Sequence, residues 1–348
     1  MRVALVTDAW KPQINGVVST LLQTMKEMQR LGIDVLRISP EQFTTVPCPS
    51  YPEIRLAVFP DPKVSEMLRE FQPDAIHIAT EGTLGVAARQ WCIAKKFRFT
   101  TSYHTQFPEY VRARWPIPLA VSYGYMRWFH DAAAQTMVST RKMQLLLEQR
   151  GFRHLKRWGR GVDTELFRPT ENYVSGSAPL FTYLGRVSIE KNVETFLTLD
   201  LPGRKVVIGD GPDREILESR FSNVRFTGVL KGPALVSELN SASALVFPSR
   251  TDTFGLVMLE AMACGVPVAA FPVTGPIDVV TPGVTGELND DLRLAALAAL
   301  KLDRHQIRKV ALTRSWANAT AEFLDNLVPV RRITTVALHR PEESSIRA

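Results

Sequence analysis

Short, mainly apolar runs alternate with longer amphipathic stretches along the first 170 residues of this chain. The runs at 3–6, 35–38, 75–78 and 99–102 have the length and composition of strands. Residues 17–31 instead repeat apolar positions at helical spacing, which predicts a helix. Because strands that alternate with helices form βαβ units, this part of the chain predicts a doubly wound α/β domain with a parallel sheet.

The alternation stops at a polar stretch of small residues, 170–177, which predicts a linker. It then restarts. Strands are expected at 180–184, 206–208, 224–227, 244–247 and 266–269, and helices at 193–199, 256–263 and about 305–326. Two successive units of this kind predict two Rossmann-like domains that face one another across a central cleft, with ligands at the carboxyl ends of the strands.

Composition agrees with a globular chain of two domains. The 348 residues are 45% apolar and 22% charged, and three cysteines have no metal-like or disulfide-like spacing, which favours reduced thiols in the cytosol. The apolar run at the N-terminus is too short for the hydrophobic region of a signal peptide. The longest uncharged run, 261–277, contains three prolines and is not expected to span a membrane, so any membrane contact is expected to be peripheral.

The net charge of +7 is unevenly distributed. The region that begins at Arg89 and ends at Arg160 has fourteen Lys and Arg against three acids, a net +11, with thirteen interleaved aromatic residues. Such a region suits an anionic membrane surface, and a solvated helical face with some aromatics in the core is the alternative. No nucleic-acid motif accompanies it, so no nucleic acid is expected as a partner.

One segment, 249–265, carries the most chemistry. Asp252 and Glu260 are separated by seven residues, after a predicted strand and on either side of a turn that opens a predicted helix. The free amide groups of a helix start attract phosphate, and a carboxylate two turns into the helix can accept two ribose hydroxyls. Phosphate and sugar bound side by side predict a nucleotide sugar as ligand.

This segment resembles the Asp/Glu-x7-Glu signature of retaining glycosyltransferases of family four, which have the GT-B fold. The stretches TDAWKPQINGV (7–17) and YHTQFPEY (103–110) resemble a branch with GDP-mannose-dependent α-mannosyltransferases and with sulfoquinovosyl- and glycosyl-diacylglycerol synthases. The resemblance runs from the first strand to about Trp316. The signature usually opens with Glu, and Asp252 is shorter by one methylene.

The resemblance implies the division of the chain. An N-terminal acceptor domain spans 1–170, and a C-terminal nucleotide-sugar-binding domain spans 171–304. A helix at about 305–330, with Trp316 and Phe323, is expected to return to the first domain, and 331–348 is expected to be a flexible tail.

A departing diphosphate needs positive charge. We find no Asp-x-Asp motif of the kind that holds Mg²⁺ in many transferases, so a metal-independent site without a cofactor is expected. Arg186 and Lys191 follow the first strand of the second domain, at the edge where phosphates bind. The guanidinium of Arg186 can donate two hydrogen bonds to phosphate oxygens, and the ammonium of Lys191 supplies a compact positive charge.

Further roles are implied by the resemblance alone. His104 would lie beside the anomeric carbon and position the donor sugar, and Asp252 would lie near the same sugar. Glu260 would bind the ribose hydroxyls, Gly16 would let the diphosphate approach the backbone, and Val229 would read the base. The backbone of four consecutive residues would meet sugar and phosphate: Thr253, Phe254, Gly255 and Leu256.

The predicted function is retaining transfer of a hexose or hexuronate from a nucleotide sugar to a lipid acceptor, with diacylglycerol favoured, at the cytoplasmic face of the membrane. A GDP-mannose-dependent α-mannosyltransferase is the close alternative, and UDP and GDP donors stay open. A non-catalytic sugar- or nucleic-acid-binding protein is the alternative of another class. A dinucleotide dehydrogenase is disfavoured because no Gly-x-Gly-x-x-Gly follows the first strand.

Overall fold

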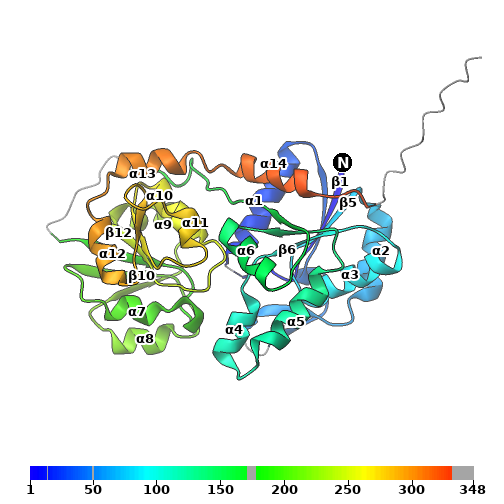
Figure 1. The fold of residues 1–348 in the computed structure, drawn as a ribbon, viewed down its shortest axis with the longest axis horizontal. Coiled ribbons are helices and arrows are strands. Elements are labelled where there is room, and N and C mark those ends of the chain that lie inside the picture. Colours follow the sequence, from blue (N-terminus) through cyan, green and yellow to red (C-terminus); the bar gives the residue numbers. More distant parts are fainter. Residues whose placement is uncertain (14, 49–50, 171–177, 331–348) are drawn as a thin grey trace, which may run out of the picture.

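The computed structural model of the chain describes residues 1–13, 15–48, 51–170 and 178–330. Two α/β units lie side by side along the long axis, each built on a six-stranded sheet (Figure 1). The two predicted Rossmann-like units are thereby confirmed. The predicted tail, 331–348, and all of the predicted linker except Thr170 lie outside the described residues.

The first sheet has the order β2-β1-β5-β6-β7-β8, and all of its pairs are parallel. Its strands are β1 (Arg2–Val6), β2 (Asp34–Ile38), β5 (Ala75–Ile78), β6 (Thr100–Tyr103), β7 (Gln135–Val138) and β8 (Leu155–Arg157). The helices of this unit are α1 (Gly16–Arg30), η1 (Pro40–Gln42), α2 (Asp61–Phe71), α3 (Thr83–Ala94), α4 (Phe107–Arg114), α5 (Leu119–His130) and α6 (Arg141–Gln149). Every residue of β5 and β6 is buried, as expected for strands with helices on both faces.

The second sheet has the order β11-β10-β9-β12-β13-β14 and is also parallel. Its strands are β9 (Leu180–Leu184), β10 (Arg204–Ile208), β11 (Arg225–Gly228), β12 (Ala244–Phe247), β13 (Val268–Ala270) and β14 (Gly286–Leu288). Its helices are η2 (Ile189–Lys191), α7 (Val193–Thr198), α8 (Arg214–Arg220), α9 (Gly232–Ser241), α10 (Leu256–Ala263), α11 (Pro276–Val279), α12 (Leu292–Ala299) and α13 (Arg304–Ala311).

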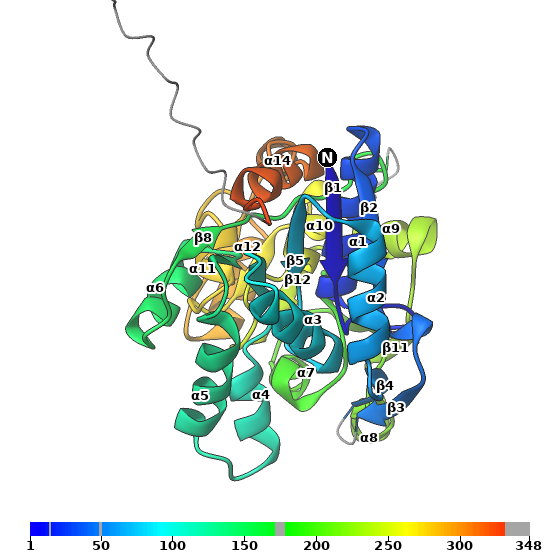
Figure 2. The same cartoon turned by 90° about the vertical axis from the view of Figure 1, so that its right-hand side faces the viewer.

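Alternating side chains of the central strands enter separate cores on the two faces of each sheet. In β9, Leu180 and Leu184 pack with α9, α10 and α13, whereas Phe181 and Tyr183 pack with α7, α8 and α12. In the first unit, α2 and α3 cover one face and α1 covers the other. Figure 2 shows α4 and α5 extending below the rest of this unit.

The C-terminal pattern at 305–326 forms two helices, α13 and α14 (Trp316–Asn326), separated by residues 312–315. Ile307 of α13 lies in the core of the second unit, whereas Phe323 of α14 lies 4.7 Å from the ring of Trp158 in the first. Ser315 begins α14 by accepting a hydrogen bond from the backbone of Asn318. The division of the chain into domains at residues 170 and 304 stays a prediction.

Five strands were not expected: β7, β8, β14 and the antiparallel pair of β3 (Thr45–Cys48) with β4 (Tyr51–Ala57). β8 and β14 have only three residues each, and β8 contains Lys156 and Arg157. Runs this short and this polar have no distinct period of two, so tertiary pairing with a neighbouring strand decides their conformation.

Candidate active site

The predicted site residues follow the carboxyl ends of strands in both sheets. His104 comes directly after β6, Arg186 two residues after β9, and Val229 directly after β11. Asp252 lies in the loop between β12 and α10. This edge is where ligands bind in open parallel sheets, so the fold gathers these residues at the expected place.

Residues of the two units bond directly to one another near His104. The hydroxyl of Thr253 donates to the backbone carbonyl of His104 at 2.7 Å, and the hydroxyl of Ser139 donates to the carbonyl of Thr253 at 2.7 Å. A Cβ on Gly16 would lie 3.6 Å from the side chain of Leu256. Four predicted residues, two from each unit, therefore meet across the boundary between the units.

Lys191 and Asp252 form a close ion pair with little exposure. The Nζ of Lys191 lies 2.5 Å from Oδ1 of Asp252 and 3.5 Å from the hydroxyl of Tyr110, which belongs to α4 of the first unit. Burial lowers the pKa of Lys191, but the facing carboxylate outweighs it and raises the pKa above the ordinary value. Lys191 is therefore a fixed positive charge at neutral pH. The other oxygen of Asp252, Oδ2, is buried and has no hydrogen-bond partner among the described residues.

A second ion pair links the same two segments. Arg114, one turn after Tyr110 on α4, places Nη2 2.7 Å from Oε2 of Glu190, the neighbour of Lys191. The Glu190 side chain is only 2% exposed. Burial by itself raises the pKa of Glu190, but the hydrogen bonds from Arg114 and Ser188 and the charge of Arg114 together outweigh it, so the net pKa is below its ordinary value. Helix α4 thus contacts η2 through two adjacent residues and holds Lys191 in place.

Arg160 determines which nitrogen of His104 carries a proton. Its Nη2 lies 3.1 Å from Nδ1 of His104, and because a guanidinium can only donate, Nδ1 must accept. Burial, followed by the charge of Arg160, lowers the pKa of His104 well below its ordinary value, so the ring is neutral. A neutral ring that accepts at Nδ1 has its hydrogen on Nε2. That Nε2 is buried and has no partner among the described residues, so it is a donor available to a sugar oxygen.

Arg160 was not predicted as a site residue and entered only as the end of the basic region. It is 6% exposed, stacks over Trp158 at 4.3 Å and donates to the carbonyl of Trp158 at 2.6 Å. Burial lowers its pKa to about 9, which leaves it charged at neutral pH. Its flanking residues Gly159 and Gly161, directly after a short strand, were the one sequence signal that could have revealed it.

Helix α10 combines an open N-terminus with a buried acid. Gly255 precedes the helix with φ of 88°, a conformation that favours glycine and lets the chain turn sharply from the loop into the helix. The amide groups of the first turn can bind an anion. Glu260, on the second turn, is half-buried, and burial raises its pKa to about 7. Hydroxyl groups that donate hydrogen bonds to this buried carboxylate would stabilise its ionised form.

The other predicted site residues differ in how far their side chains are buried. Phe254 is 6% exposed and packs into the core of the second unit, so only its backbone faces the loop. Val229 is 42% exposed. Arg186 is half-buried, and its carbonyl accepts a hydrogen bond from the Tyr183 hydroxyl at 2.6 Å. Among the residues that the structure describes, no group of three or more His, Cys, Asp or Glu could hold a metal ion.

Two family models match the chain, one in each unit. The model described as Glycosyltransferase Family 4 matches residues 14–166, and the model described as Glycosyl transferases group 1 matches residues 178–302. The predicted resemblance and the expected transferase chemistry are confirmed by these matches.

Complete proteins and a solved structure agree with the models. A GDP-mannose-dependent α-mannosyltransferase of Mycolicibacterium smegmatis is 32% identical over 367 residues, which cover 93% of this chain and 96% of the relative. An α-monoglucosyldiacylglycerol synthase of Streptococcus pneumoniae is 26% identical over 78% of this chain and 71% of the relative. The structure of Anabaena HepE in complex with UDP and glucose is similar in fold, with a TM-score of 0.68, 16% identity and coverage of 93% and 98%.

Proposed function

The chain belongs to glycosyltransferase family 4 and is a hexosyltransferase that uses a nucleotide-sugar donor, and from this premise we propose that it transfers a hexose or hexuronate to a lipid acceptor with retention of configuration. We favour diacylglycerol as the acceptor and the cytoplasmic face of the membrane as the place of reaction. The observation that carries the proposal is the pair of unpartnered buried atoms, Nε2 of His104 and Oδ2 of Asp252, which belong to opposite units joined by the bond from Thr253 to His104.

Positive charge for the leaving diphosphate comes from the second unit. Lys191 supplies a fixed ammonium, Arg186 a guanidinium, and the N-terminus of α10 supplies amide donors. Gly16 leaves room for the diphosphate where the first unit approaches Leu256. Glu260 accepts the two ribose hydroxyls, and the backbone at Val229 contacts the base.

The transfer step uses few groups of the protein. The acceptor oxygen bonds to the anomeric carbon on the face from which the diphosphate oxygen departs, and the acceptor proton passes to that diphosphate oxygen. His104 donates from Nε2 to the donor sugar and acts as a positioning group, since its lowered pKa and its bond from Arg160 leave no basic nitrogen facing the site. Oδ2 of Asp252 accepts from a sugar hydroxyl while Oδ1 stays with Lys191.

A GDP-mannose-dependent α-mannosyltransferase is the second candidate. Its support is the 32% identity to the mycobacterial enzyme, which extends over nearly all of both chains. The backbone contacts expected at Val229 suit uracil and guanine alike, so this candidate uses the same donor site. The third hypothesis, a binding protein without activity, is disfavoured because the family and its curated relatives are enzymes.

A panel of nucleotide sugars, each assayed with vesicles that contain diacylglycerol, tests the proposal. We expect one UDP-sugar to give a glycosylated lipid with the configuration of the donor. We also expect the same rate in excess EDTA, because side chains and a helix terminus neutralise the diphosphate. Transfer from GDP-mannose alone would favour the second candidate, and a strict requirement for Mg²⁺ would contradict the neutralisation by Lys191 and Arg186.

The basic residues between 89 and 160 do not form one continuous exposed surface. Arg89 and Arg160 are buried, and Arg114 is paired with Glu190. The exposed apolar residues concentrate instead on α4, α5 and the turn between them. We call this set the hairpin surface: Phe107, Trp115, Ile117, Val121, Tyr125 and Trp128, between 38% and 63% exposed. Arg112 is an exposed cation beside it.

We propose that the hairpin surface contacts the membrane. It lies on the two helices that extend below the first unit in Figure 2, and it combines Trp and Tyr with nearby Arg, a composition suited to the lipid headgroup region. In the part of the chain that the structure describes, no helix is long and apolar enough to cross a bilayer.

Vesicle sedimentation tests this surface. We expect phosphatidylglycerol vesicles to retain the protein at about 0.1 M salt and to release most of it at about 1 M, because the screening length falls from about 10 Å to about 3 Å. Arg112→Gln should lower the retained fraction, whereas Lys231→Gln, an exposed cation of the second unit, should not. Equal retention on neutral phosphatidylcholine vesicles would contradict the electrostatic part of the proposal.

A further inference from the structure

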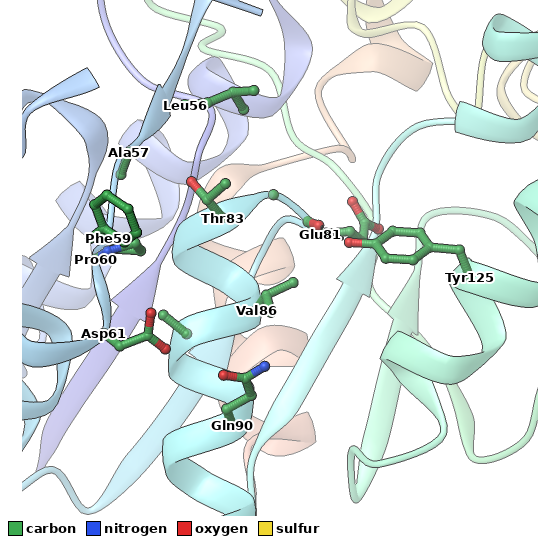
Figure 3. Close-up of a pocket in the computed structure, with 12 residues that line it drawn as sticks. Leu56, Ala57, Phe59, Pro60, Asp61, Glu81, Thr83, Val86, Gln90 and Tyr125 are labelled. Carbon is green, nitrogen blue, oxygen red and sulfur yellow. Dashed lines mark hydrogen bonds between the residues drawn. The ribbon is translucent and has the colours of Figure 1, made fainter. Parts of the chain in front are cut away.

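A hollow of about 470 Å³ lies in the first unit, outside the residues assigned to the transfer reaction (Figure 3). Thr83, Val86 and Gln90 project from successive turns of α3 along its floor. Phe59, in the turn between β4 and α2, lies on one side, and Tyr125 of α5 lies on the other. The walls are mainly apolar, which suits a hydrocarbon ligand.

Phe59 is placed at this hollow at a conformational cost. The residue is 89% exposed, and its φ of 48° is in the left-handed region that bulky residues rarely adopt. It also lines a second hollow of about 430 Å³ on the neighbouring surface. Because an exposed ring gains little from folding, its strained placement points to a ligand that the ring contacts.

The charges around the hollow select the kind of ligand. Of the twelve residues that line it, Asp61 and Glu81 are acidic and none is basic. Two carboxylates repel a phosphate group and accept hydrogen bonds from hydroxyls. The hollow therefore suits a neutral, hydroxyl-bearing molecule with an apolar chain and disfavours an anionic phospholipid.

Glu81 connects the hollow with the reaction site. Its Oε1 lies 3.1 Å from Nε2 of His130, and its backbone carbonyl accepts from the Tyr125 hydroxyl at 2.5 Å. The ring of His130 lies 5.9 Å from that of Tyr103, the residue before His104. One end of the hollow thus lies at the strand edge that carries His104.

The Tyr125 side of the hollow, where Glu81 also lies, is continuous with the hairpin surface. The rings of Tyr125 and Trp128 are 5.6 Å apart, and Arg89 fixes Trp128 by stacking at 4.0 Å and donating to its carbonyl at 2.7 Å. A lipid that leaves a membrane at this surface would reach the hollow without passing a basic residue of its lining.

We propose that this hollow seats an acyl chain of a neutral diacylglycerol-type acceptor between Phe59 and Tyr125, with the free hydroxyl directed past Glu81 toward His104. This inference rests on the proposed function and adds to it the place where the acceptor binds and the reason for its neutral charge.

Photolabelling of the wild-type protein tests the site directly. A diacylglycerol with a diazirine in one acyl chain, presented in phosphatidylcholine vesicles, is expected to label residues 56–63 and 83–90, and unlabelled diacylglycerol should compete. Label elsewhere, with transfer to diacylglycerol intact, would overturn the inference and leave the proposed function standing. Competable label in the hollow without any transfer to diacylglycerol would support the site and contradict the proposed acceptor.

Variants supply the kinetic test. Phe59→Asn removes the ring and suits the left-handed backbone, and Val86→Trp fills the floor of the hollow. Both are expected to raise KM for long-chain diacylglycerol about tenfold, a change typical of losing one apolar contact surface. Nucleoside-diphosphate affinity and Tm should stay at wild-type values, and Leu312→Asn, an exposed residue between α13 and α14, should change none of these quantities. An unchanged KM in both variants of an active enzyme would overturn the inference.

Discussion

Lys191→Met is expected to lower kcat/KM by about 10²–10³-fold, the largest activity loss that we predict for a single substitution. The ammonium of Lys191 is fixed by Asp252 and Tyr110, so it stabilises the charge of the departing diphosphate without reorganising. Steady-state kinetics with saturating acceptor measure the effect. Lys191→Arg keeps the charge and should recover part of the rate.

Stability must be measured alongside, because removing Lys191 leaves the Asp252 carboxylate unpaired with only 15% exposure. We expect Tm to fall by a few degrees, far too little to explain the rate. Lys309→Met, at an exposed position of α13, is the matched control and should behave as wild type. Wild-type kcat/KM in Lys191→Met would refute the role of this residue at the diphosphate.

Glu260→Gln is expected to make the free protein more stable at pH 8 and to weaken nucleotide binding. The folded protein holds the Glu260 proton up to a pKa of about 7, whereas the ordinary value is 4.5. Between these values the folded state binds more protons than the unfolded state, so stability falls as pH rises through this window and is level above it. Removing the ionisation should add about 1–2 kcal/mol at pH 8, less than the full shift implies because Glu260 is only half-buried.

Binding of the nucleotide has the opposite dependence. Ribose hydroxyls donate to the ionised carboxylate, so the affinity of the wild-type protein for a nucleoside diphosphate should rise as pH increases through about 7. In Glu260→Gln the affinity should be about 10–100-fold lower and independent of pH over this window. Calorimetric titration at pH 6 and pH 8 measures both changes, and denaturant unfolding measures stability.

Glu215→Gln provides the comparison, since Glu215 is exposed on α8 of the same unit. It should leave both the affinity and the pH dependence of unfolding unchanged. A Glu260→Gln protein that binds nucleotide as tightly as wild type would remove Glu260 from the ribose site. A variant that is less stable at pH 8 would show that the carboxylate has a structural partner.

The sequence alone determined the elements whose formation depends on neighbouring residues. The apolar runs at 180–184 and 244–247 and the helix at 256–263 have the predicted bounds, because buried strand runs and good helix formers act over a few positions. The order of these elements was sufficient to predict two parallel sheets, and the acid spacing in 249–265 was sufficient to predict the family.

Only the tertiary structure decided how the site residues pair. The bond from Thr253 to His104 joins positions 149 apart, and the contact of Arg160 with His104, which determines the proton position on the ring, joins positions 56 apart. The hollow beside Phe59 likewise requires four separate elements, β4, α2, α3 and α5, to converge. Local patterns are set by short-range chain geometry, whereas these contacts arise from the packing of elements that lie far apart along the chain, which no single stretch of residues encodes.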